Sequence, residues 1–246
     1  MKKVLLYLFL STTLVINAQN SIPIDEISIG LNYTIPDVSF SSSGHKDSVI
    51  SQQAESKIGY SLGIINIFRK AKPIQFIYGV ELNYLSFDYE TNYETSTFNP
   101  ADNKNKGYII QDNLKGTMNS MMVTVPLIFR YNLIHTKQKI PIFIDAGFKY
   151  DFITAYYSEY KMNHYQYNAL QETYSKETLE DKTRFYNKRY NLNLTFGVGT
   201  ILKRTSLKLS YTLPAFALST NILNYYGEGE VKMNYLNFSV NYKLRK

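Results

Sequence analysis

From residue 25 onward, apolar and polar residues alternate with a period of two, which is typical of β-strands whose two faces meet different surroundings. Near residue 60, for example, Tyr60, Leu62 and Ile64 lie on one face and Ser61 and Gly63 on the other. The same pattern predicts eight strands, over about residues 25–35, 56–69, 74–90, 117–132, 140–157, 188–202, 205–214 and 230–244.

The connections between these strands alternate between long and short without exception. An up-and-down barrel in an outer membrane has this arrangement, because its periplasmic turns are short and its extracellular loops are long. Several strands exceed the ~9–11 residues that a tilted strand needs to cross the hydrocarbon, so we expect them to project beyond it. The sequence therefore predicts an all-β fold, an eight-stranded antiparallel transmembrane barrel formed by residues 20–246.

A soluble barrel of the lipocalin kind would show the same alternation, but its polar face would meet water and be rich in Lys and Glu. Here the polar face consists mostly of Gly, Ser, Thr and Asn with isolated charges, which suits a narrow lumen filled by side chains. The chain contains 23 Tyr and 14 Phe, and many lie near strand ends on the apolar face, as interfacial girdles do. The pattern favours the membrane barrel.

The first 19 residues are predicted to form a secretory signal peptide. Met1–Lys3 is a basic start, Val4–Leu10 is an apolar run, and a small residue precedes a polar junction after Ala18 or Gln19. The apolar run is too short to span a bilayer, which needs about 20 apolar residues. We therefore expect export to the outer membrane of a Gram-negative cell. The chain has no cysteine, so its fold is held without disulfides.

The formal net charge is +7, but an exported protein without a compact basic and aromatic motif is not expected to bind nucleic acid. The basic excess lies in the short connections and at the C-terminus. We expect this rim to contact anionic lipid head groups, at about 1 kcal/mol for each contact, with ordinary solvated turn charges as the alternative. Its members are Arg69, Lys70, Lys72, Lys137, Lys139, Lys203, Arg204, Arg245 and Lys246.

Candidate chemistry is sparse. A His, an acid and a Ser in the outer loops would provide a general base, and two long connections hold such residues: His45 with Asp47 and Ser48, and His164 with Glu159. No close set of His or acidic residues matches a zinc or calcium site, and no Gly-rich phosphate loop occurs. We expect no catalytic, metal or cofactor site. The chain's histidines are His45, His135 and His164.

Six charged residues fall on the polar face of the predicted strands. Because unpaired charges in a narrow barrel are costly, we expect them to pair across strands, with a conducting pathway as the functional alternative. They are Glu81, Arg130, Asp145, Lys149, Asp151 and Lys208.

Five segments share a recognisable strand pattern: 123–131, with Pro126 inside a strand, then 140–147, 195–199, 207–211 and 236–242. They resemble strands of the PorT-like outer-membrane β-barrel proteins of the Bacteroidetes lineage. The resemblance implies the same barrel, insertion by the outer-membrane insertion machinery, and a possible place in a secretion apparatus. One departure is the end at Arg245 and Lys246, where family members often carry an aromatic residue that the insertion machinery recognises.

The longest connections, residues 91–116 and 158–187, are polar with scattered tyrosines. Tyr offers a large contact area with a hydrogen-bonding tip, so these loops are candidates to bind an extracellular glycan or protein. A solvated loop without a ligand is the alternative. The tyrosines are Tyr93, Tyr108, Tyr160, Tyr165, Tyr167 and Tyr174.

Overall fold

The computed structural model describes residues 24–41, 48–68, 73–97, 108–133, 141–168, 173–184, 190–215, 218–223 and 227–244. Within these ranges the chain forms eleven strands, and none of it forms a helix suited to crossing a membrane. The predicted signal peptide lies outside them and stays a prediction. The strands are β1 Glu26–Ser41, β2 Ser48–Ser56, β3 Ile58–Phe68, β4 Ile74–Thr97, β5 Tyr108–Leu133, β6 Ile142–Asn168, β7 Thr173–Arg184, β8 Tyr190–Leu202, β9 Thr205–Pro214, β10 Leu218–Leu223 and β11 Gly227–Lys243.

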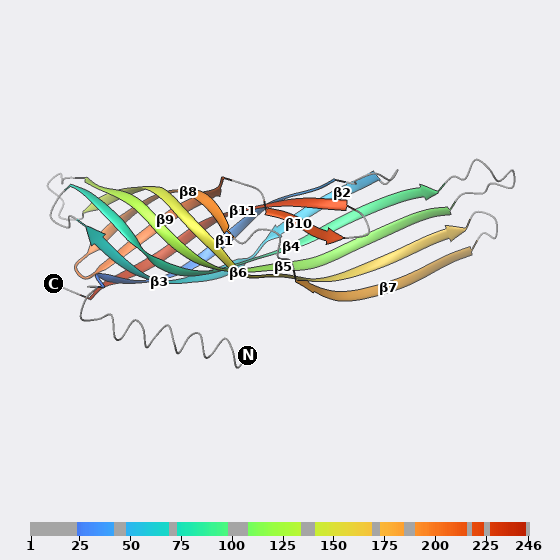
Figure 1. The fold of residues 1–246 in the computed structure, drawn as a ribbon, viewed down its shortest axis with the longest axis horizontal. Helices are drawn as coiled ribbons and strands as arrows, with labels where there is room; N and C mark the ends of the chain where they lie inside the picture. The colour runs from blue at the N-terminus through green and yellow to red at the C-terminus, as the bar shows by residue number, and fades with distance from the viewer. Residues whose placement is uncertain are drawn as a thin grey trace, which may run out of the picture.

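Eight of these strands form a closed antiparallel ring (Figure 1). Their order is β1-β3-β4-β5-β6-β8-β9-β11, and β11 returns to β1 through a ladder that runs from Glu26 opposite Lys243 to Ser41 opposite Glu228. Each of the eight predicted stretches corresponds to one strand of the ring. The predicted fold class, an eight-stranded antiparallel barrel, is confirmed.

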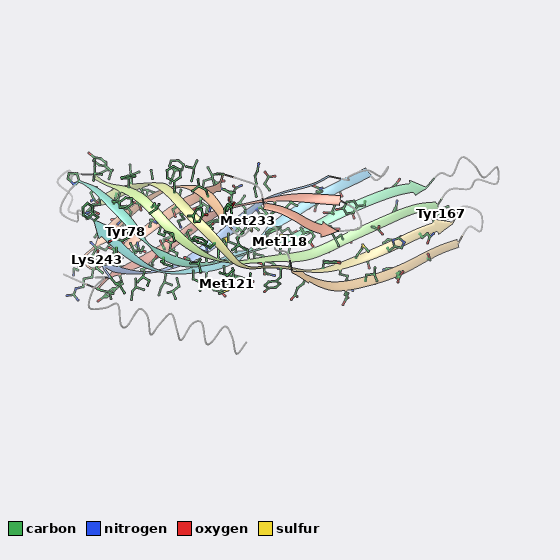
Figure 2. The ribbon with its side chains drawn as sticks, in the orientation of Figure 1. Tyr78, Met118, Met121, Tyr167, Met233 and Lys243 are labelled. Atoms are coloured by element: carbon green, nitrogen blue, oxygen red, sulfur yellow. The ribbon has the colours of Figure 1, made fainter. Side chains whose placement is uncertain are left out.

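The barrel wall is apolar outside and polar inside. On β5, for example, Leu127 and Phe129 are exposed, whereas Thr124 and Arg130 point into the lumen and are buried. Side chains stand out around the whole barrel in Figure 2, where Tyr78 marks the exposed face of β4. An apolar outer surface with a polar interior is the arrangement of a barrel that is surrounded by hydrocarbon rather than by water.

The predicted loops at residues 91–116 and 158–187 are a misassignment that the structure corrects. Most of each segment belongs to strands that continue beyond the barrel: β4 and β5 stay paired out to Thr97 and Tyr108, and β6 pairs with β7 out to Asn168 and Thr173. The physical reason is that the outward face of these strands is apolar in the barrel and polar beyond it, while the inward face changes in the opposite sense. The apolar positions therefore shift by one residue, and the period of two is interrupted there.

Beyond the barrel the strands separate into two facing sheets, which we call the extension (Figure 1). One sheet has the order β2-β4-β5-β6-β7, and the other joins the outer parts of β1 and β11 to β10. Met118 and Met233, labelled in Figure 2, belong to the apolar core between them. The buried members of this core are Leu85, Phe87, Tyr89, Tyr93, Leu114, Met118, Met122, Val231, Met233 and Tyr235.

A β-bulge lies on β6 where the barrel meets the extension. Met121 is paired with Ala155 and Met122 with Ile153, so that Thr154 is an extra residue in the ladder. The Thr154 hydroxyl donates a hydrogen bond to the carbonyl oxygen of Met121 at 2.8 Å. A bulge bends its strand and increases the local twist. Before it, odd-numbered residues of β6 face inward, and after it even-numbered residues do.

The strands β3, β5, β8 and β11 end at the opposite end of the molecule from the extension (Figure 1). The short connections of the barrel follow the first three of these strands along the chain. In outer-membrane barrels the short turns are periplasmic. The extension is therefore on the extracellular side.

Candidate functional site

The six predicted lumen charges are brought together inside the barrel, and five of them form ion pairs. Lys149 Nζ donates to Glu81 Oε2 at 2.8 Å. Arg130 Nε and Nη2 donate to the two carboxylate oxygens of Asp145 at 2.8 and 3.0 Å, and Lys208 Nζ lies 3.5 Å from Asp145 Oδ2. All five side chains are buried. The prediction that these charges pair across strands is confirmed for five of the six.

The sixth charge, Asp151, is held by neutral groups. It accepts hydrogen bonds from the Thr124 hydroxyl at 2.5 Å and from the Asn193 amide. An adjoining cavity, lined by Asp151, Tyr235 and six further residues, has a volume of only about 10 Å³. The lumen at this level is filled by its own side chains.

Apolar groups also pack in the lumen beside the charges. Ile65, Ile77 and Ile128 form a buried cluster, and the Arg130 guanidinium lies 3.7 Å from the centre of the Phe143 ring. On the extracellular side lies the apolar core of the extension. The barrel therefore serves as a packed support, and its lumen charges are structural.

The histidine hypothesis gains no support. His45 and His135 lie outside the described residues. His164 Nδ1 lies 2.7 Å from Asp112 Oδ1 on the inner face of the extension, whereas the exposed Glu159 belongs to the outer face. Among the described residues, no three His, Cys, Asp or Glu side chains gather as metal ligands would.

Of the predicted basic rim, Lys203 and Arg204 lie in the β8–β9 turn and are exposed. The Lys203 backbone adopts a φ of 55°, which a tight turn between two strands requires. The other members of the rim lie outside the described residues, so the contact with anionic lipid stays a prediction.

Those tyrosines of the predicted loops whose side chains the structure describes do not form one contact surface. Tyr93 is only 3% exposed and belongs to the apolar core of the extension, where burial raises its pKa, and Tyr160 packs against the same core. Tyr165 lies on the outer face, with Lys176 Nζ 5.3 Å from its ring centre. The expectation of a tyrosine-rich binding surface is wrong for Tyr93.

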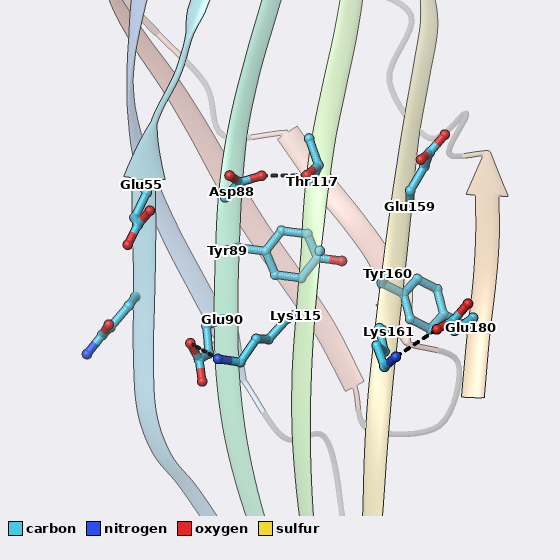
Figure 3. A pocket seen from close by; sticks show the side chains of 12 residues that line it. Glu55, Asp88, Tyr89, Glu90, Lys115, Thr117, Glu159, Tyr160, Lys161 and Glu180 are labelled. Atoms are coloured by element: carbon cyan, nitrogen blue, oxygen red, sulfur yellow. Dashed lines mark hydrogen bonds and ion pairs between the residues drawn. The ribbon is translucent and has the colours of Figure 1, made fainter. Parts of the chain in front are cut away.

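The outer face of the β2-β4-β5-β6-β7 sheet contains a groove with a volume of about 830 Å³ (Figure 3). The strand registers place five of its side chains in one row, one from each strand. We call this the charged row, and its members are Gln53, Glu90, Lys115, Lys161 and Glu180.

Two ion pairs order the charged row. Lys115 Nζ lies 2.9 Å from Glu90 Oε2, and Lys161 Nζ donates to Glu180 Oε1 at 2.8 Å. Lys115 and Lys161 are direct partners on neighbouring strands, a position at which like charges repel, and each lysine pairs with the carboxylate on its other side. Hydrogen bonds from Lys115 and Asn113 lower the pKa of Glu90, and that from Lys161 lowers the pKa of Glu180. Both carboxylates are therefore charged at neutral pH.

A row of amides follows the charged row on the side away from the membrane. Asn113 Nδ2 donates to Glu90 Oε1 at 2.8 Å and to Asn92 Oδ1 at 2.5 Å, and Asn92 donates to the Ser51 hydroxyl at 2.8 Å. Further along, the Thr178 hydroxyl donates to Asn163 Oδ1 of β6 at 3.0 Å. The amide row, beside the groove, thus holds donors and acceptors in an ordered network and fixes the Glu90 carboxylate.

A third row lies on the membrane side of the groove. Lys57 Nζ lies 2.6 Å from Asp88 Oδ1 and donates to the Thr117 hydroxyl at 3.4 Å. Glu55 is the register partner of Asp88, and Glu159 is that of Thr117. This row adds carboxylates to the groove in excess of its lysines.

The floor of the groove rests on the apolar core. The Tyr89 ring crosses the strand at Gly116, where a Cβ atom would lie 2.6 Å from the Tyr89 hydroxyl and 2.8 Å from the Glu159 carbonyl oxygen. Only glycine leaves room for this close approach. The groove is therefore a polar face built on a packed sheet.

The sequence matches known outer-membrane proteins. Residues 17–227 match the family described as "Outer membrane protein beta-barrel domain". The chain belongs to this family. No protein with a curated description matches it.

Three solved barrels are similar to this member of the family. OprG from Pseudomonas aeruginosa is 11% identical, with 91% of this chain and 97% of that chain covered and a TM-score of 0.36. Ail of Yersinia pestis, solved with the heparin analogue sucrose octasulfate, is 12% identical over 90% and 99% of the chains, with a TM-score of 0.30. Neisserial surface protein A is 12% identical over 89% and 96%, with a TM-score of 0.31.

Sequence reasoning missed the charged row, although a signal for it exists. Glu90 is the last residue of the predicted strand 74–90, and Lys115, Lys161 and Glu180 fall in predicted loops. Lys161 lies between Tyr160 and Met162, and Lys115 follows Leu114, so apolar and polar residues still alternate near these two lysines. Reading that alternation with its faces exchanged would have predicted a polar outer sheet.

Proposed function

We propose that this protein is a non-enzymatic outer-membrane barrel that binds an extracellular ligand in the groove of its extension. The observation that carries the proposal is the charged row, which runs across five strands around a groove of about 830 Å³. Ligand sites are concave and place a few polar groups on a rigid support. The extension meets this description because its groove rests on a buried apolar core.

The packed lumen supports a binding role over a transport role. Eight strands enclose only enough space for side chains, and the ion pairs of Lys149 and Arg130 occupy that space. We expect purified protein in a planar bilayer to give no stepwise ion current. Steps of the size that porins produce would contradict the proposal.

A ligand screen tests the binding role directly. The protein is placed in lipid nanodiscs and applied to glycan and peptide arrays, beside the double variant Lys115→Ala/Lys161→Ala. We expect at least one class of ligand to bind the wild-type protein and to be lost in the double variant. The matched control is Lys176→Ala, an exposed lysine of β7 on the same sheet that does not line the groove.

Two results of the screen would overturn the proposal. One is the absence of any specific ligand, and the other is a ligand that binds the double variant as well as the wild type. Each variant is first checked for the mobility shift on heating that a closed barrel gives on a denaturing gel. This check separates a damaged groove from a damaged fold.

The narrower resemblance to PorT-like proteins gives the alternative function, an accessory role in a secretion apparatus. Co-purification with large membrane partners would favour it. Export by the signal peptide, insertion by the outer-membrane insertion machinery and contacts of the basic rim with lipid head groups belong to both proposals. Loss of lipid or peptide turnover on His164→Ala would instead favour an enzyme.

A further inference from the structure

We propose that the groove holds the saccharide head group of a glycolipid from the outer leaflet of the same membrane. This inference rests on the proposed function and names its ligand. It follows from where the groove lies relative to the membrane and from the chemistry of its lining.

The groove is on the same face of the sheet as the lipid-contacting wall. On β4, Val80 and Leu82 lie on the outer wall of the barrel, and Asp88 and Glu90 line the groove further along the same face. All four are even-numbered residues of one continuous strand, so their side chains point to the same side. The groove therefore opens sideways above the lipid, rather than upward into the medium.

Tyrosines mark the level at which the membrane ends on this face. The rings of Tyr60 and Tyr84 stack with their centres 5.0 Å apart, and the Tyr84 hydroxyl donates to Asn119 Oδ1 at 2.5 Å. Aromatic rings with a polar tip are typical of the membrane–water interface. Beyond Tyr84 the outward-facing residues of β4 are polar, beginning with Ser86.

The height of the groove selects the kind of head group that reaches it. Asp88 lies four positions after Tyr84, which corresponds to about 13 Å along the strand and about 10 Å in height at the usual barrel tilt. The polar zone of a phospholipid leaflet is only about 5–7 Å deep. A phospholipid head group therefore ends below the groove, whereas a saccharide head group extends into it.

The lining suits hydroxyl-rich sugars. Five carboxylates and two ammonium groups line the groove, and three of the carboxylates form ion pairs with lysines. Such a surface accepts and donates hydrogen bonds at neighbouring points, as sugar hydroxyls require. The excess of carboxylates disfavours phosphorylated or sulfated units, because like charges repel across an interface. We therefore infer uncharged or amino-bearing sugars.

An extended peptide fits the groove less well. Peptides that bind a sheet add to its edge, where main-chain hydrogen bonds are unused. The charged row lies on a sheet face, and its central members Glu90, Lys115 and Lys161 belong to strands paired on both sides. A ligand there meets side chains only.

Titration calorimetry with a defined probe tests the inference. The probe is the deacylated oligosaccharide released from the glycolipid of the organism's own outer membrane, and the protein is the full chain in nanodiscs. We expect saturable binding that weakens about tenfold or more in Lys115→Ala/Lys161→Ala, because two hydrogen bonds to charged groups are lost. Glu90→Gln keeps the size of the side chain and is expected to weaken binding in the same direction. Lys176→Ala is expected to bind like the wild type.

The outcomes separate this inference from the proposed function. If the intact glycolipid binds but the deacylated oligosaccharide does not, the acyl chains on the barrel wall carry the binding, and the inference is wrong. If an array ligand binds at the groove while the oligosaccharide does not, the proposed function stands and the inference fails. If nothing binds the groove, both are wrong.

Discussion

The barrel and the extension are built from the same strands, yet their faces have opposite character. On β4 the inward side chains are polar in the barrel, as at Glu81 and Asn83, and apolar in the extension, as at Phe87. The outward side chains change from Leu82 to Glu90 over the same distance. The exchange occurs where the surroundings change from hydrocarbon to water, since each face follows the solvent that it meets. The same strand is thus part of a lipid-surrounded barrel wall at one end and of a water-exposed two-sheet sandwich at the other.

The largest expected effect compares two Lys–Glu pairs of equal length. Lys149 and Glu81 are buried in the barrel and Lys161 and Glu180 are exposed on the extension, both at 2.8 Å. Removing one partner of a buried pair leaves an uncompensated charge, so we expect Lys149→Ala to lower the free energy of unfolding by about 3–5 kcal/mol. Lys161→Ala is expected to leave it unchanged, since exposed pairs contribute little. Urea unfolding in lipid vesicles measures both.

Two results for Lys149→Ala would contradict the expectation of a packed, ion-paired lumen. Equal unfolding midpoints for Lys149→Ala and the wild type would mean that the lumen relaxes or admits water. Single-channel recording of Lys149→Ala adds a second check, because a packed lumen predicts no new current. A clear increase in current would show that Lys149 blocks a pathway.

A second substitution is expected to act on the extension alone. Phe87 is fully buried in the apolar core, and Phe→Ala changes in such cores cost about 3–5 kcal/mol. We expect Phe87→Ala to loosen the extension while the barrel stays closed, because the lumen pairs are untouched. Hydrogen exchange of β4 and β5 beyond Phe87 is expected to rise, and the mobility shift on heating to persist. Asp88→Ala, one residue further on the opposite face, is the control and is expected to leave exchange unchanged.

The exchange of faces also explains which parts of the structure the sequence predicts. In the barrel part of β5 the odd-numbered residues from Val123 to Tyr131 are apolar, which gives a regular period of two. Beyond it the apolar residues are the even-numbered Leu114, Met118 and Met122. The period therefore shifts by one residue at the membrane boundary, and this shift looks like the end of a strand. The barrel strands were predictable, and their continuations were not.

The groove was harder to predict for a second reason. Its charged row depends on the registers of five strands, and the register of β6 depends on the bulge at Thr154. Nothing in the local sequence marks Thr154 as an extra residue. The composition of β7, rich in Lys and Glu, is also typical of a loop, and its strand state comes from pairing with β6.

Deleting a residue tests the role of the bulge, with a smaller expected effect. Because Ile153 and Ala155 already pair with Met122 and Met121, removal of Thr154 leaves every other pair and both faces in place. We expect this variant to fold, with a mobility shift on heating and an extension as resistant to protease as the wild type. Removing Lys161 from a regular part of β6 is the contrast. It moves the following residues to the opposite face, so the outer end of β6 is expected to become protease-sensitive.

The smallest effect concerns pH and the exposed pair Glu90–Lys115. Hydrogen bonds from Lys115 and Asn113 lower the pKa of Glu90 below its ordinary value of 4.5. The stabilisation from this lowered pKa is present above the ordinary value and is lost as pH falls through the lowered one. In Lys115→Ala we expect the pKa of Glu90 to rise toward 4.5, as followed by carbon NMR of its carboxyl group. Lys176→Ala is expected to leave it in place. An unchanged pKa in Lys115→Ala would mean that Asn113 alone holds the carboxylate, and the groove would then owe its order to the amide row rather than to its ion pairs.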